Sequence, residues 1–144
     1  MNILYCGDKP MQKGILLSSM SLIKNVDEPL NIYILTVDYR EKGINYKPVD
    51  KAFAKYLEEK LNKSDIKVNI FLVDVTRYFV EELPEANMQS RFTACCMLRL
   101  FADKTDIKDR VLYLDTDVLC RKGFRDFYHQ NMEDRKSTRL NSSH

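Results

Sequence analysis

Short apolar runs alternate with amphipathic segments along most of this chain, and that alternation constrains the fold more than any other feature. The strand-like runs, rich in consecutive aliphatic side chains, cover residues 2–6, 29–38, 66–75 and 110–117. The segments with helical spacing cover residues 11–24, 49–63, 77–83 (ended by Pro84) and 92–103. This order predicts an α/β fold in which a mostly parallel sheet carries helices on both faces.

The last eleven residues, 134–144, differ in origin from the rest. They match the in-frame translation of a common short-read sequencing adapter, so we exclude them from the fold prediction. We therefore expect residues 1–133 to be the N-terminal part of a longer protein, with a fold truncated on its C-terminal side. The tail accounts for the whole formal net charge of +2. Because the remainder is neutral, we expect no nucleic-acid partner.

Neither export, membrane insertion nor a disulfide framework is indicated. The chain opens on an apolar run without a basic start, and no run approaches the roughly 20 apolar residues of a membrane span. The cysteines lack Cys-x-x-Cys spacing, so we expect reduced, mostly buried thiols at Cys6, Cys95, Cys96 and Cys120. We expect a cytoplasmic protein, or one held peripherally at the inner membrane through the missing C-terminal part.

Acidic residues follow three of the four strand-like runs. Asp8 comes just after the first and Asp74 lies near the end of the third, while Asp115 and Asp117 lie at the end of the fourth. Ligands of parallel sheets bind beyond the carboxyl ends of the strands. This edge should therefore suit a cation, or a phosphorylated ligand that binds together with one.

Asp115 and Asp117 stand in the run VLYLDTDVLC. Chance alone predicts such a pair in a chain this rich in Asp, so its position carries the information. In an extended chain residues i and i+2 point to the same face, which would bring the two carboxylates together. Like charges there are costly unless protonated, solvated or neutralised, and their oxygens suit Mg²⁺ or Mn²⁺. The alternative is a solvated strand end with two ordinary surface aspartates.

Two other enzyme classes use acidic residues on α/β folds. A haloacid-dehalogenase-type phosphotransferase carries its Asp-x-Asp on the first strand, followed by Thr or Val two places later. Here the pair lies at the end of the fourth strand-like run, and that place is Leu119. A nucleotidyltransferase should show a Gly-rich basic loop after the first strand, which CGDKPMQKG matches poorly. Both remain alternatives.

The segment RVLYLDTDVLCRKGFRDFY resembles the metal-binding strand of family 8 glycosyltransferases, the glycogenin- and lipopolysaccharide-galactosyltransferase-like group. Upstream, NILYCGD resembles their opening strand and nucleotide loop, LNIYILTVDY their second strand, and FTACCMLRLF the helix that bears an Arg-Leu pair. The resemblance covers residues 2–128 in order. It implies a GT-A (Rossmann-like) fold and a bacterial-type enzyme. Such an enzyme would transfer a hexose from a UDP-sugar to a glycan or lipid-linked saccharide, with Mn²⁺ or Mg²⁺ and with retention of configuration.

The resemblance also implies roles for particular residues. Asp115 and Asp117 would be the metal ligands and the catalytic pair. The nucleotide-sugar would contact Tyr5, Cys6, Asp8, Arg99, Asp115 and Thr116, with Asp8 on the uracil and Arg99 on the sugar or diphosphate. The alternatives are an ordinary helical pair of Arg99 with Asp103 at i+4, and a loop cap for Asp8.

The sequence departs from this family at two points. Pro10 stands where a polar residue follows the base-binding Asp in better-known bacterial members, and the third metal ligand, a downstream His, has no counterpart. We expect His129 to be a surface or capping residue. A chain truncated in this way should expose apolar surface and be inactive alone. A non-catalytic nucleotide-sugar-binding module is therefore a further alternative.

Overall fold

A computed structural model describes residues 1–82, 94–107 and 109–132. The expected helix end at Pro84, the side chains of Cys95 and Cys96, and the adapter-like tail lie outside this description. No helix in the described part of the chain combines the length and the apolar character that a membrane crossing requires.

The alternation of strands and helices is confirmed. The strands are β1 (Asn2–Cys6), β2 (Leu30–Thr36), β3 (Val68–Asp74) and β4 (Leu112–Tyr113). The α-helices are α1 (Gln12–Asn25), α2 (Lys51–Leu61), α3 (Thr76–Glu81) and α4 (Arg125–Tyr128). Two 3₁₀ segments, η1 (Lys9–Met11) and η2 (Ala94–Lys104), complete the described elements. From residue 94 on, the segment expected as a helix over 92–103 is thus wound more tightly than an α-helix.

The strands form one sheet in the order β3-β2-β1-β4, and every pair is parallel. β2 pairs with β3 over seven residues, from Leu30 opposite Val68 to Thr36 opposite Asp74. β4 pairs with β1 at two positions only, Ile3 with Leu112 and Leu4 with Tyr113. The mostly parallel sheet is therefore confirmed. Its pairing is long between β2 and β3 and very short between β1 and β4.

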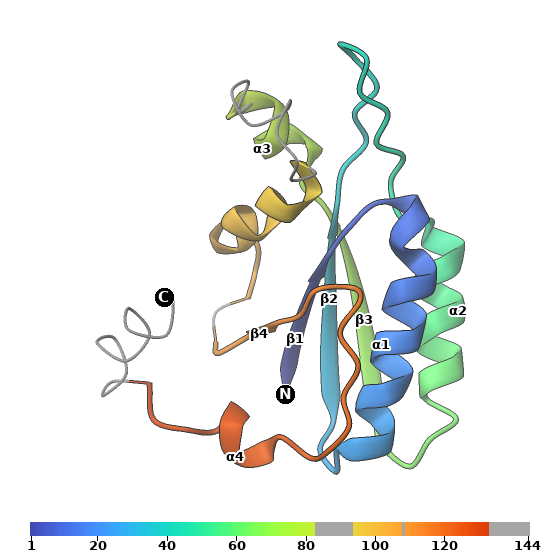
Figure 1. Cartoon of the computed structure of the whole chain (residues 1–144), viewed down its shortest axis with the longest axis vertical. Helices are drawn as coiled ribbons and strands as arrows, with labels where there is room; N and C mark the ends of the chain where they lie inside the picture. Colours follow the sequence, from blue (N-terminus) through green and yellow to red (C-terminus); the bar gives the residue numbers. More distant parts are fainter. Residues whose placement is uncertain (83–93, 108, 133–144) are drawn as a thin grey trace.

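Two apolar clusters cover the two faces of the sheet, as successive strand residues point to opposite sides. Ile3 and Tyr5 of β1 pack on one face with α1 and α2, around Ile15, Leu22 and Leu57. Leu4 and Cys6 of the same strand pack on the other face with α3 and η2, around Phe79, Leu98 and Phe101. Figure 1 shows α1 and α2 together on one side of the sheet and α3 on the other. Helices therefore cover both faces, as expected.

Candidate functional site

The chain leaves the sheet immediately before the two aspartates. The last backbone bond to β1 runs from the Leu114 N–H to the Leu4 carbonyl, at 3.0 Å. The Val118 N–H then donates to the Asp115 carbonyl at 3.1 Å, which closes a turn over residues 115–118. The expected strand over 110–117 is wrong beyond Tyr113. The two carboxylates are consequently placed by a turn and not by the alternation of an extended strand.

Both carboxylates of the turn are exposed, and one of them is oriented by a neighbouring ring. The Tyr113 hydroxyl donates to Asp115 Oδ1 at 2.8 Å. The guanidinium of Arg99 lies 5.5 Å from the centre of the Tyr113 ring, a cation–π distance. Tyr113 therefore contacts both residues: Arg99 through the face of its ring and Asp115 through its hydroxyl.

The alternative pairing of Arg99 with Asp103 is not formed among the described ion pairs. The physical reason is the 3₁₀ winding of η2. With three residues per turn, positions i and i+4 point in different directions, whereas in an α-helix they share a face. Arg99 is exposed and stacks on Tyr113. The structure thus gives Arg99 and one of the two predicted metal ligands, Asp115, a common neighbour in Tyr113.

The donor set at the turn fits a hard divalent cation. Two exposed carboxylates can each offer an oxygen, and Mg²⁺ or Mn²⁺ usually fills its other positions with water and phosphate oxygens. Within residues 1–82, 94–107 and 109–132, no third Cys, His, Asp or Glu joins them to form a larger metal-binding group. His129 Nε2 lies 3.0 Å from Glu28 Oε1. Glu28 precedes β2, so this contact lies at the amino ends of the strands, opposite the turn. His129 is a surface residue, as expected.

Asp8 follows β1, the strand that neighbours β4, and therefore lies at the same edge as the turn. Its loop is fixed by bonds from the Gly7 N–H to the Leu35 carbonyl and from the Lys9 N–H to the Lys47 carbonyl. Asp8 is only 7% exposed, and its side chain makes no capping bond to η1. Burial raises the pKa of its carboxyl group above the ordinary value, and a backbone hydrogen bond opposes that shift. The loop-cap alternative is therefore not supported.

Tyr5 and Cys6 end β1 with their side chains in the two cores. The hydroxyls of Tyr5 and Ser18 share a buried hydrogen bond of 2.7 Å, and burial raises the pKa of the Tyr5 phenol. Only the backbone of these two residues could therefore face a ligand at the sheet edge. Cys120 is a free thiol.

Asp74, the acidic residue at the end of β3, is separated from the turn by the order of the sheet. Two strands, β2 and β1, lie between β3 and β4. Its Oδ1 accepts bonds from both the N–H and the hydroxyl of Thr76, at the start of α3. Asp74 thus serves as a local cap, and the acidic edge that the sequence predicts divides into separate parts.

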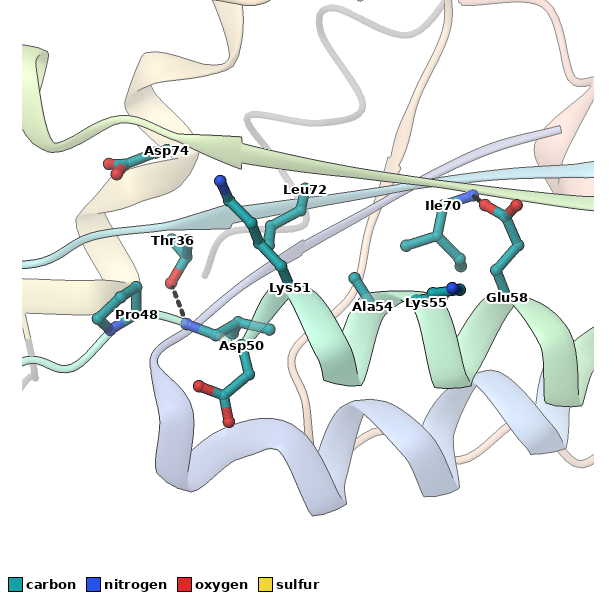
Figure 2. A pocket seen from close by; sticks show the side chains of 11 residues that line it. Thr36, Pro48, Asp50, Lys51, Ala54, Lys55, Glu58, Ile70, Leu72 and Asp74 are labelled. Carbon is teal, nitrogen blue, oxygen red and sulfur yellow. Dashed lines mark hydrogen bonds between the residues drawn. The ribbon is translucent and has the colours of Figure 1, made fainter.

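A cavity of about 560 Å³ opens away from the predicted residues, between α2 and the carboxyl halves of β2 and β3 (Figure 2). None of the residues singled out as donor or metal contacts lines it. Its acidic groups are engaged: Asp50 with Lys9 at 3.4 Å, and Glu58 with the Ile70 N–H at 2.8 Å. In Figure 2 the Asp50 carboxylate points away from β3. The cavity is therefore separate from the Asp115–Asp117 turn.

Sequence reasoning missed a second stripe on α1. Gly14, Ser18, Ser21 and Asn25 recur at helical spacing beside the apolar face. The described contacts direct this stripe toward β1 and toward the segment that follows β4. The spacing of small and polar residues was visible in the sequence, but the partners of Gly14, Ser21 and Asn25 lie about 100 positions away.

Two solved structures match nearly the whole chain. A crystal structure of an active-site mutant of LgtC matches with a TM-score of 0.70 and 18% identity, over 93% of this chain and 44% of that chain. A crystal structure of mouse xyloside xylosyltransferase 1, in its apo form, matches with a TM-score of 0.55 and 14% identity, over 90% of this chain and 47% of that chain. This chain thus spans less than half the length of either structure.

No protein-family model and no curated protein matches the sequence. The likeness therefore lies in the arrangement of the backbone. A parallel sheet with helices on both faces follows both solved structures over nine-tenths of this chain or more. On that evidence the chain has the GT-A fold of glycosyltransferases.

Proposed function

We propose that residues 1–133 form the nucleotide-sugar-binding part of a metal-dependent, retaining family 8 glycosyltransferase. The enzyme would transfer a hexose from a UDP-sugar to a glycan or a lipid-linked saccharide. The observation that carries the proposal is the exposed Asp115–Asp117 turn, which follows β4 beside the Asp8 loop of β1. In parallel sheets this edge is where ligands bind. The fold shared with a xylosyltransferase supports the proposal.

The residues at this edge of the sheet would each have a separate role in binding the donor. Asp115 and Asp117 would hold Mn²⁺ or Mg²⁺, and the bound ion would neutralise the diphosphate leaving group. Tyr113 orients Asp115 through its hydroxyl, and Arg99 adds a cation that suits phosphate oxygens. Thr116, between the two ligands, would contact the nucleotide-sugar.

The Asp8 loop would hold the base. Burial of Asp8 favours directional hydrogen bonds to a uracil edge over ion pairing with a solvated cation. The backbone at Tyr5 and Cys6 would line the base pocket, because the side chains of both residues are buried in the cores.

Calorimetric titration of the chain with UDP, with and without Mn²⁺, tests the donor site. We expect Mn²⁺ to tighten UDP binding, and we expect Asp115→Asn and Asp117→Asn to abolish that gain. Asp65→Asn is the matched control, because Asp65 is exposed and precedes β3 at the opposite edge of the sheet. The proposal would be refuted by a UDP affinity that does not change with Mn²⁺. It would equally be refuted if the Mn²⁺-dependent increase in affinity persisted in both variants.

A second candidate is a module that binds the nucleotide-sugar without turning it over. The described residues favour it in one respect, since they supply two carboxylates and no third metal ligand. Release of UDP from UDP-hexoses separates the two candidates. Metal-dependent UDP binding without any UDP release would favour the binding module for this chain.

A further inference from the structure

Little in the sheet holds the segment that carries the two aspartates. Beyond the bond from Leu114 to Leu4, the described backbone bonds of residues 115–119 are limited to the turn that joins Asp115 and Val118. Short exposed segments of this kind move readily, because few contacts oppose local opening. Something other than β1 must therefore fix the turn if its two carboxylates are to act together.

Helix α1 holds the far end of this segment at Cys120. The Cys120 N–H donates to Ser21 Oγ at 2.8 Å, and Asn25 Nδ2 donates to the Cys120 carbonyl at 3.1 Å. Both backbone groups of one residue are thus bonded to side chains one helical turn apart. In Figure 1 the segment after β4 runs down beside α1.

The network at Cys120 is directional. The Ser21 hydroxyl donates its own proton to the Ser18 carbonyl at 2.5 Å, so its lone pairs are left to accept the Cys120 N–H. Asn25 Nδ2 also donates to the Ser21 carbonyl at 2.9 Å, which fixes the amide orientation. The two side chains are therefore oriented by the helix itself before they meet the segment.

The near side of the turn lies against the first turn of α1. A Cβ atom built on Gly14 would be 2.5 Å from the Thr116 carbonyl oxygen. Only glycine allows this approach, and Thr116 is the residue between the two carboxylates. Helix α1 thus contacts the segment at the turn and again at Cys120.

We propose that Ser21 and Asn25 are positioning residues, which act through Cys120 to fix the two carboxylates of the Asp115–Asp117 turn for a divalent cation. The role rests on the proposed function for its metal. Groups that orient metal ligands typically change affinity by about 10- to 100-fold when removed. We expect loss of either side chain to weaken Mn²⁺ binding within that range while the fold persists.

The test combines two readouts on the chain with Ser21→Ala and Asn25→Ala. Amide exchange measured by NMR should show at least 10-fold faster exchange at Cys120 in Ser21→Ala. In a titration with Mn²⁺ alone, NMR line broadening at residues 115 and 117 reports the binding. It should show about 10-fold weaker Mn²⁺ binding in both variants. Ser21→Thr keeps the hydroxyl and should restore both values. Ser64→Ala is the matched control, because its hydroxyl donates to the Leu61 carbonyl away from the turn.

Each outcome decides a separate point. Wild-type Mn²⁺ affinity in both variants would overturn the positioning role, even with faster exchange at Cys120. A wild-type chain that leaves residues 115 and 117 unaffected by Mn²⁺ would refute the proposed function, and the metal-positioning role with it. Circular dichroism establishes that each variant is folded. If Ser21→Ala does not fold, the Mn²⁺ affinities of Asn25→Ala and Ser21→Thr, compared with wild type, decide the question.

Discussion

Replacement of Gly14 by alanine should weaken Mn²⁺-dependent UDP binding at the Asp115–Asp117 turn much more than it lowers the stability of the chain. The added Cβ would lie 2.5 Å from the Thr116 carbonyl oxygen, where ordinary contact begins at 3.4 Å. The turn must therefore retreat by roughly 0.9 Å, because the helix backbone at this point is fixed by its own bonds. Gly14 itself has no unusual backbone conformation, so the effect is one of space alone.

The cost in stability should be small. Overpacking of this kind costs about 1–3 kcal/mol, and alanine in a helix regains about 0.5–1 kcal/mol over glycine. The net loss of about 0–2.5 kcal/mol lowers the Tm of a domain of this size by no more than roughly 10 °C. The effect on the turn should be larger. A displacement near 1 Å can weaken a positioned interaction by about 100-fold.

The assay is calorimetric titration with UDP in the presence and absence of Mn²⁺, together with a thermal melt. Gly43→Ala is the control, since Gly43 has φ of +76° but nothing within 4 Å of an added Cβ. It should cost about 1–2 kcal/mol through backbone strain and leave the Mn²⁺-dependent affinity unchanged. If Gly14→Ala kept the wild-type Mn²⁺-dependent affinity, the contact with Thr116 would not control the turn.

Two further predictions concern buried polar groups. Burial raises the pKa of Asp8, so ionising its carboxyl group in the folded chain lowers the stability. This loss is absent below the ordinary value of 3.8 and develops as the pH rises from there through the raised pKa. Asp8→Asn should therefore melt higher than wild type at pH 7 and equally at pH 3.5, as followed by thermal melts across that range. The Tyr128 hydroxyl accepts from the Asn2 N–H at 2.8 Å and donates to the Arg110 carbonyl at 2.9 Å. Tyr128→Phe leaves the Asn2 N–H unpaired, whereas the Arg110 carbonyl still accepts from Asn2 Nδ2 at 3.0 Å. The change should cost about 1–3 kcal/mol, measured by urea unfolding. Parallel pH curves for Asp8→Asn, or an unchanged urea midpoint for Tyr128→Phe, would contradict these expectations.

The sequence predicted the elements whose signal is local. β2 and β3 were predicted because their runs of aliphatic residues are long, and α2 because its apolar residues keep helical spacing. The parallel sheet followed from the alternation itself. The positions of Asp8 and Asp115 at one edge of the sheet also followed, since the carboxyl ends of parallel strands share one edge. The order that makes β1 and β4 neighbours did not.

What the sequence could not supply depends on distant contacts. The run Val111–Leu114 is as apolar as a longer strand, but the chain turns at Asp115 and its pairing with β1 stops there. The i+4 spacing of Arg99 and Asp103 suggests an ion pair only if the helix is α, and its 3₁₀ winding is not encoded in that spacing. The bonds from Ser21 and Asn25 to Cys120 join residues almost 100 positions apart.

The outer edge of β3 is closed by side chains of its own covering helix. Asn62, which caps the end of α2, bonds both the N–H and the carbonyl of Val68, and Glu58 accepts the N–H of Ile70. Helix α2 therefore takes the place of a fifth strand over the first half of that edge. At the other side, β4 pairs for only two residues, and Val118, Leu119 and Phe127 nearby expose large apolar side chains. A further strand, from whatever source, can therefore pair with the free side of β4 far more readily than with the outer side of β3.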